Sequence, residues 1–419
     1  MKIRAAAFWV PIAGTLLAGT QPAWSTSTQT VLHSFDFGTG DGANPQSDLI
    51  ADSAGNLYGT TLYGGAGGSG FGTVFMLTPT EDPNIWTETV LYAFQGGPDG
   101  ANPNGGLAIN RKGVLFGTTQ AGGQANSGAV FQLSPPKSGR HWREKNLYSF
   151  CSLANCADGQ QPFAGVTIGA GGMLYGTTLF GGAGAFQGNG GTVYRLTPPA
   201  DKGGSWTETV LHNFCDQENC ADGYQPQAGR LLLTKRGTIY GTASKSAQAG
   251  TLYALVPNGG AFTFGVLHEF SLSNGDGGGP YAGVVADQNG VLYGTTEGRG
   301  ANGCGTVYSF GSAYQTLYSF CSKADHSDGA LPYAGVVVKA GRSGVTLYGT
   351  TLSGGNGGGV IYKLTGGSET VLHMFCSQQN CSDGESPLYG SLLDLNGLLY
   401  GTTGLGGDND AGVVYSQTK

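Results

Sequence analysis

Apolar residues along this chain fall in short runs that end at Gly, Asp, Asn or Pro. Short apolar runs bounded by turn residues are typical of β-strands, and helical periodicity is absent beyond the N-terminal segment. One run, LYGTT, recurs with small substitutions at intervals of 52 to 65 residues. The seven copies begin at Leu57, Leu115, Leu174, Ile239, Leu292, Leu347 and Leu399. Repeats of this length are typical of one supersecondary unit in an array or a propeller.

Each repeat contains four apolar runs. In the second repeat they are GGLAI from Gly105, VLFGTT from Val114, GAVFQLS from Gly128 and NLYSF from Asn146. Four short antiparallel strands at a fixed period predict the blade of a β-propeller, and a solenoid is the alternative.

The two ends of the chain favour the propeller. The chain has an extra fourth-strand motif from Thr30 and ends on a third-strand motif from Gly412. A ring accommodates both if Val31 to Phe35 complete the last blade, whereas a solenoid would need polar caps, which are not visible. We predict an all-β, seven-bladed β-propeller of four-stranded antiparallel blades, closed by the N-terminal strand.

The N-terminus is typical of a secretory signal peptide. Lys2 and Arg4 precede an apolar stretch from residue 5 to 18, and Ala23 and Ser25 fit a signal-peptidase site. A membrane anchor is the alternative, but the stretch is short and contains Pro11. We predict a signal peptide at 1–25 and one propeller domain at 26–419, secreted to the extracellular space, the periplasm or the cell surface.

Composition narrows the partners. Gly contributes 78 of 419 residues, charged residues are 11%, and the net charge is −7. An acidic, weakly charged chain argues against nucleic acid and anionic lipid as partners. No other segment is long enough to span a membrane, and we expect a monomer.

The cysteines agree with export. Three pairs share the spacing CxxxxC, while the fourth such segment has Cys321 and then His326, and Cys304 is left over. If Phe310 lies opposite Gln315 in a hairpin, Cys304 faces Cys321, which predicts four bridges; zinc binding is the alternative. The predicted bridges are Cys151 to Cys156, Cys215 to Cys220, Cys304 to Cys321 and Cys376 to Cys381.

The strings TVLxxF, DGxxPxxGL, GxLYGTTxxGG and GTVFxL recur through residues 30 to 415. This tandem pattern resembles the bacterial choice-of-anchor GloVer-repeat proteins. The resemblance implies an exported propeller-like repeat protein whose relatives often end in surface-anchoring modules, and it implies no activity. The chain departs from that pattern because it ends at Lys419 directly after a strand motif, so we do not expect an anchor.

One Asp–Gly pair precedes the first strand of each blade. A ring of carboxylates near a central channel could hold Ca²⁺. The alternative, which we favour, is that Asp before Gly builds a turn by accepting backbone N–H bonds. We therefore assign no metal site, and the residues that would hold a cation are Asp41, Asp99, Asp158, Asp222, Asp276, Asp328 and Asp383.

Histidine and tryptophan also follow the repeat. Four His share one position of the fourth-strand motif with Tyr, as His33 and Tyr92 illustrate, which indicates a packing and hydrogen-bonding role instead of catalysis. Trp86, Trp142 and Trp206 share another position, which favours blade-to-blade packing over carbohydrate stacking.

Residues that break the repeat are better functional candidates, because an asymmetric ligand needs groups that the other blades lack. Three Gly-rich loops after LYGTT depart most from the repeat, although surface loops also vary without functional cause. The candidate ligand-binding residues are Lys245, Glu297, Arg299, Phe180, Phe186, Gln187 and Asn189. No catalytic motif occurs, and no catalytic residue is assigned.

These features predict a binding module for a glycan or an envelope protein. One alternative is a polysaccharide lyase or glycoside hydrolase, in which Glu297 and either Asp276 or Asp328 would supply the two carboxylates. A purely structural envelope module is the other.

Overall fold

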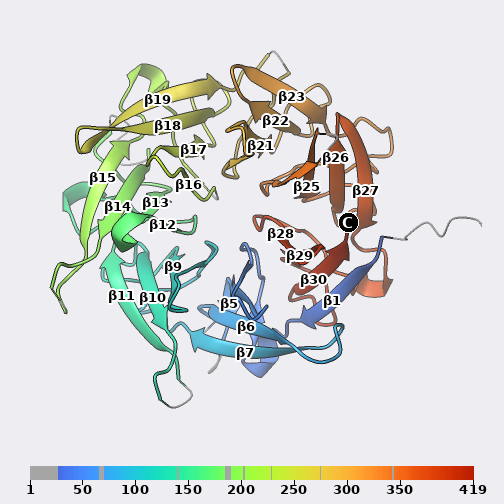
Figure 1. Ribbon diagram of the computed structural model, residues 1–419, viewed down its shortest axis with the longest axis horizontal. Coiled ribbons are helices and arrows are strands. Elements are labelled where there is room, and N and C mark those ends of the chain that lie inside the picture. The colour runs from blue at the N-terminus through green and yellow to red at the C-terminus, as the bar shows by residue number, and fades with distance from the viewer. Residues whose placement is uncertain are drawn as a thin grey trace, which may run out of the picture.

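The computed structural model describes residues 27–65, 70–138, 141–184, 190–201, 203–227, 229–273, 275–341 and 344–419. Seven four-stranded antiparallel sheets stand in a ring around a central axis (Figure 1). The predicted seven-bladed propeller is confirmed. Among the described residues no helix is long and apolar enough to cross a membrane.

The strands follow one another from the axis outward in each blade. Blade 1 has β3 (Ile50–Ala51), β4 (Leu57–Thr61), β6 (Thr73–Pro79) and β7 (Trp86–Ala93). Blade 2 has β8 (Ala108–Ile109), β9 (Leu115–Thr119), β10 (Ala129–Ser134) and β11 (Arg143–Ser149). Blade 3 has β12 (Thr167–Ile168), β13 (Leu174–Thr178), β14 (Thr192–Thr197) and β15 (Thr207–Asn213). Blade 4 has β16 (Leu232–Leu233), β17 (Ile239–Ala243), β18 (Thr251–Asn258) and β19 (Ala261–Glu269).

The remaining blades have the same order. Blade 5 has β20 (Val285–Ala286), β21 (Leu292–Thr296), β22 (Thr306–Phe310) and β23 (Tyr314–Ser319). Blade 6 has β24 (Val337–Gly341), β25 (Gly344–Thr351), β26 (Val360–Thr365) and β27 (Ser368–Met374). Blade 7 has β28 (Leu393–Leu395), β29 (Leu398–Thr403), β30 (Val413–Thr418) and β1 (Gln29–Ser34). Short 3₁₀ turns lie at Phe37–Thr39, Ala154–Cys156, Ala170–Gly172, Glu218–Cys220 and Gln379–Cys381.

The ring closes as predicted. Strand β1 pairs antiparallel with β30, so Gln29 lies opposite Gln417 and Ser34 opposite Val413. In Figure 1 the blue N-terminal strand completes the red C-terminal blade. Pairing between the two ends of the chain replaces a covalent closure.

The LYGTT strand is the buried second strand of each blade. Its glycine is required by packing: a Cβ on Gly59 would lie 2.5 Å from Cζ of Phe75 on the adjacent third strand. The same close approach recurs at Gly176, where the hydroxyl of Tyr194 lies 2.4 Å from the position of a Cβ. Glycine therefore makes room for the large ring of the third strand.

All four predicted disulfides are present, but one supporting assumption was wrong. Phe310 lies opposite Tyr314, not Gln315, and a β-bulge after Val307 then shifts the register by one residue. The bulge restores the alignment on which the bridge between Cys304 and Cys321 depends. The same irregularity occurs between the third and fourth strands of every blade. The other bridges are Cys151–Cys156, Cys215–Cys220 and Cys376–Cys381.

Two sets of loops share one face of the ring. In blade 1, β2 (Gly42–Ala43) of the entering loop pairs with β5 (Tyr63–Gly64), which follows LYGTT. Single bridges at corresponding positions join the two loops in the other blades, for example Gln160 with Phe180. We call this side, formed by the entering loops and the Gly-rich loops, the entry face.

Candidate binding site at the channel mouth

The seven Asp residues that precede glycine sit in the connections between blades. Asp158 accepts hydrogen bonds from the Tyr148 hydroxyl at 2.8 Å and from the backbone N–H of Ser152 at 2.9 Å. His212 Nε2 lies 3.0 Å from the carboxylate of Asp222, whose side chain is fully buried. The other pairs are His33–Asp41, Tyr92–Asp99, His268–Asp276, Tyr318–Asp328 and His373–Asp383. The backbone hydrogen bond to Asp158 is the kind expected of a turn residue, and the bonds from His and Tyr side chains come in addition.

The His or Tyr series of the outermost strands and the Asp series of the entering loops are therefore bonded to each other. The His or Tyr of each outermost strand bonds the Asp that follows it, once per blade, and ties the strand to the connection. Within the described residues, one group of three potential metal ligands lies close together: Cys376, Cys381 and Glu385. Its two sulfurs form a disulfide, so they are not available as thiolate ligands.

The candidate loop residues do not form one charged cluster. Lys245 and Arg299 are exposed, and no ion pair between described residues joins either one to Glu297. Phe180 is half-buried and its backbone pairs with Gln160. Phe186, Gln187 and Asn189 lie outside the described residues.

Glu297 instead faces the neighbouring blade. Its Oε1 accepts a hydrogen bond of 2.8 Å from the hydroxyl of Tyr333. Burial, and then the contact with Glu297, raises the pKa of Tyr333 above its ordinary value, so the hydroxyl stays protonated and donates.

Tyr333 belongs to a cluster of four aromatic side chains that precede the innermost strands of different blades. Tyr281 and Tyr333 lie 4.9 Å apart between ring centroids, Tyr333 and Tyr389 5.9 Å, and Phe163 and Tyr389 5.2 Å. All four are half-buried. We call Phe163, Tyr281, Tyr333 and Tyr389 the mouth cluster. Contact between non-adjacent blades 3 and 7 means that these rings reach over the axis.

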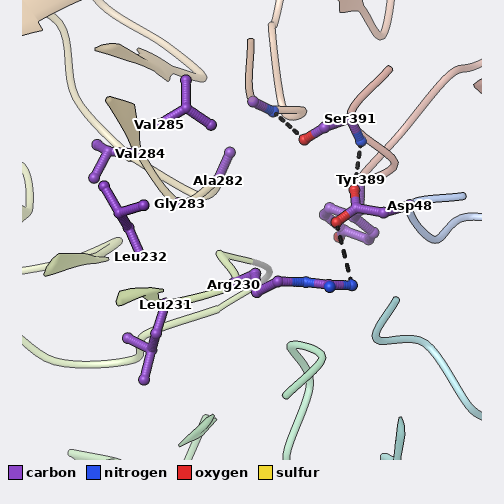
Figure 2. A pocket seen from close by; sticks show the side chains of 11 residues that line it. Asp48, Arg230, Leu231, Leu232, Ala282, Gly283, Val284, Val285, Tyr389 and Ser391 are labelled. Atoms are coloured by element: carbon purple, nitrogen blue, oxygen red, sulfur yellow. Dashed lines mark hydrogen bonds and ion pairs between the residues drawn. The ribbon is translucent and has the colours of Figure 1, made fainter. Parts of the chain in front are cut away.

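Beneath the mouth cluster, three blades depart from the repeat. The residue before the buried Leu or Val that leads into the innermost strand is glycine in four blades: Gly106, Gly165, Gly283 and Gly335. In the other three blades it is Asp48, Arg230 or Ser391. These three residues line a cavity of about 210 Å³ together with Tyr389. Figure 2 shows Arg230 extended across this cavity toward Asp48.

The three side chains are linked to one another and to the backbone. Arg230 Nη2 lies 3.7 Å from Asp48 Oδ2 and donates a 2.9 Å hydrogen bond to the carbonyl of Leu107. Ser391 N–H donates to Asp48 Oδ1 at 2.6 Å, and Gly335 N–H donates to Ser391 Oγ at 3.2 Å. Arg230 Nε is buried without a partner in the structure. The guanidinium of Arg230 in blade 4 thus lies close to the carboxylate of Asp48 in blade 1.

A local insertion accompanies two of these departures. The segment from proline to the buried residue is one residue longer in blade 4 (Pro226 to Leu231) and blade 7 (Pro387 to Leu392) than in the others, such as Pro162 to Val166. Where the segment of the following blade has the usual length, a second-strand Thr can bond its backbone. For example, the hydroxyl of Thr242 in blade 4 donates to the carbonyl of Ala282 in blade 5. The corresponding hydroxyls of Thr177 and Thr350, which face the longer segments, are buried without a partner.

Sequence reasoning missed this site because it searched for departures only in the loops after LYGTT. The signal was present in the entering motif, where AGV and GGL become SDL, GRL and GSL. Aligning that motif alone would have identified Asp48, Arg230 and Ser391.

The fold and its channel define a repeat-built β-propeller. The chain belongs to the Gloeobacter/Verrucomicrobia repeat family, whose pattern matches residues 13–153, 142–343 and 235–419. No curated protein matches the sequence.

Solved structures with a similar arrangement are distant. A Dyadobacter fermentans protein of unknown function is 11% identical, with 93% of this chain and 96% of that chain covered and a TM-score of 0.42. The polysaccharide lyase Uly1 is 10% identical, with 92% of each chain covered and a TM-score of 0.44. The Trypanosoma rangeli sialidase is 11% identical, with 93% of this chain and 55% of that chain covered and a TM-score of 0.39.

Proposed function

We propose that the protein is an exported binding module that holds a carbohydrate at the mouth of the propeller channel. The mouth cluster carries this proposal, because four half-buried rings from separate blades meet at the axis and one of them, Tyr333, bonds the Glu297 carboxylate. Binding sites combine apolar and aromatic walls with a few well-placed polar groups, and a tyrosine offers both an apolar face and a hydroxyl.

The chemistry at the site suits a neutral or acidic sugar. The ring faces offer apolar contact to C–H groups, Glu297 accepts hydrogen bonds from hydroxyls, and Arg230 lines the cavity beside Asp48. The four disulfides support an oxidising compartment, which is where envelope and extracellular glycans occur. Extracellular location and a glycan partner are both parts of the proposal.

The test is calorimetric titration with a panel of envelope, plant and fungal polysaccharides. Tyr389→Ala should weaken binding of a recognised glycan by about tenfold or more, equivalent to about 1.4 kcal/mol. Tyr63→Ala is the matched control, because Tyr63 is 44% exposed on the entry face but outside the mouth cluster. Equal affinity of the two variants would contradict the assignment of the site.

Glu297→Gln separates binding from hydrolysis. A hydrolase needs a second carboxylate near the cleaved bond. The two residues considered for that role, Asp276 and Asp328, are engaged by His268 and Tyr318 of the outermost strands. We therefore expect Glu297→Gln to change the affinity for a recognised glycan. We do not expect the natural chain to cleave a glycan by a reaction that the variant has lost.

A further inference from the structure

A large aromatic residue stands at or next to the start of the outermost strand in blades 1 to 4. Trp86, Trp142, Trp206 and Phe262 occupy this position, two residues before Glu88, Glu144, Glu208 and Phe264. The Trp86 ring lies 6.0 Å from that of Tyr400 in blade 7, and Trp142 lies 6.4 Å from Tyr58 in blade 1. Trp206 packs against a cluster that contains Phe116 of blade 2 and Leu196 of blade 3, so all three tryptophans pack between blades, as predicted.

Blade 6 has no side chain at this position. Gly367 stands two residues before Glu369, and it shares a tight hairpin turn with Gly366. Both glycines have positive φ, 57° at Gly366 and 82° at Gly367, a conformation that disfavours other residues. The short turn therefore removes the indole and the loop that would carry it.

A cavity of about 440 Å³ remains where the indole would lie, at the seam between blades 5 and 6. This is within the range of roughly 300–1,000 Å³ found for small-ligand sites. We call this cavity the seam slot; its apolar walls are Val291, Tyr293, Leu317, Val345, Leu347 and Leu364. It opens beside the hairpins between third and fourth strands, away from the mouth cluster.

The walls of the seam slot match those of a filled seam residue by residue. Trp86 packs in a cluster that contains Leu32, Leu57, Leu77 and Tyr400. The corresponding repeat positions at the slot are Leu317, Leu347, Leu364 and Tyr293. The slot thus has the wall residues of an indole site, but the chain supplies no indole to fill it.

The polar edge of the slot matches as well. In the filled seam, Trp86 Nε1 donates a hydrogen bond of 3.2 Å to the carbonyl of Pro83 in its own loop. Blade 6 lacks such a loop, but Ser309, Gln315 and Thr316 line the slot and offer acceptors. At the seam between blades 6 and 7 a lysine covers the corresponding tyrosine: the Lys419 ammonium lies 5.8 Å from the centre of the Tyr348 ring.

We propose that the seam slot binds the tryptophan side chain of a partner polypeptide. Three seams of the same chain show that an indole delivered by a polypeptide fits walls of this composition. An unfilled apolar cavity forfeits dispersion contacts, so an indole that enters it gains both those contacts and apolar burial. The site is independent of the glycan proposal, because the two sites are built from different residues.

The experiment is a calorimetric titration of the whole protein with N-acetyl-tryptophanamide and with a pentapeptide that carries one central Trp. The expected result is one molecule bound per chain, with nuclear Overhauser contacts between indole protons and the methyl groups of Val345 and Leu347. Val345→Trp, which fills the slot from its own wall, should weaken binding by about tenfold or more. The same pentapeptide with Ala for Trp should not bind.

Trp86→Gly is the matched control, because it opens an equivalent cavity next to Tyr400 and should add a second site for the same probes. Binding by this variant but not by the natural chain would overturn the proposal, since an open slot between blades 5 and 6 would then lack the needed shape. Binding that survives Val345→Trp, or binding of free indole without binding of the peptide, would also overturn it.

Discussion

Charged residues at the blade seams repeat in every blade, whereas charged residues at the channel mouth occur in single blades. At the seams, an Asp that is buried in five of the seven blades is bonded by the His or Tyr of an outer strand, as in His212–Asp222. At the channel, Asp48 and Arg230 each occur in one blade, at a position that is glycine in four others. A contact that every blade repeats builds blades, whereas a departure confined to the axis leaves the blades intact and changes the lining of the central cavity.

The largest expected effect comes from breaking a repeated contact. Asp222→Ala leaves His212 and the backbone N–H groups of Asp216 and Gln217 without their buried acceptor. We expect the free energy of unfolding in urea to fall by about 3 kcal/mol. Asp216→Ala, an exposed carboxylate in the same loop, should change it by no more than about 0.5 kcal/mol. Equal losses in the two variants would erase the distinction between seam and surface.

The disulfides allow a comparison within the repeat itself. The bridge Cys304–Cys321 spans 17 residues, whereas the repeated loop bridge Cys376–Cys381 spans 5. Because loop closure restrains the unfolded chain more for longer loops, replacing both cysteines by Ser should cost about 3 kcal/mol in the first case and about 2 kcal/mol in the second. Denaturant titration of the two double variants measures the difference, and the reverse order would contradict this account.

A pH titration tests the partly buried carboxylate of Glu208 in an outer strand. Burial, and then the charge of Asp158, raises the pKa of Glu208 to about 7, and its Oε1 has no hydrogen-bond partner in the structure. The folded state therefore holds this proton more tightly than the unfolded state, in which the pKa of Glu208 is 4.5. The stability contribution of Glu208 is most favourable below about pH 4.5 and is lost as the pH rises to about 7.

Glu208→Gln should remove this dependence. After allowance for solvent screening of the partly exposed group, the variant should be more stable than the natural chain by about 1 kcal/mol at pH 8. The difference should shrink toward pH 4.5. Glu218→Gln, at an exposed position, should show neither effect. A difference between Glu208→Gln and the natural chain that does not vary with pH would refute the titration of Glu208.

The smallest effect on stability is expected at the channel. Arg230→Gly introduces the glycine that four other blades have at this position and removes a partly exposed ion pair with Asp48. The free energy of unfolding should fall by about 1 kcal/mol or less, and a double-mutant cycle with Asp48→Gly should give a coupling of about 0.5 kcal/mol. A loss of stability as large as that of Asp222→Ala would mean that the channel residues are needed to hold the fold together.

The fold could be predicted because each blade repeats the same evidence of strand and turn. LYGTT locates the second strand, the orphan motifs at the two ends locate the closure, and CxxxxC locates three disulfides. The register of the blade 5 hairpin could not be read in the same way. A bulge adds one residue without changing the composition of the strand, as it does after Val307.

The candidate site was predicted only in part. Glu297 was singled out because its loop departs from the repeat, but its partner Tyr333 stands in a motif, YAGV, that conforms to it. Sequence shows that Phe163 and Tyr389 occupy similar places in blades 3 and 7. It does not show that their rings lie 5.2 Å apart, because that distance is set by the curvature of the closed ring.

The pairing of β1 with β30 also has a consequence for biosynthesis. The strand that seals the ring is among the first to be synthesised and the last to find its partner, since Gln29 must wait for Gln417. Until then β1 is an unpaired edge that can pair with another chain, and the ring is an open arc. Contacts this far apart in sequence also close slowly. The ring can therefore close only after β30, the last strand of blade 7 along the chain, has been made.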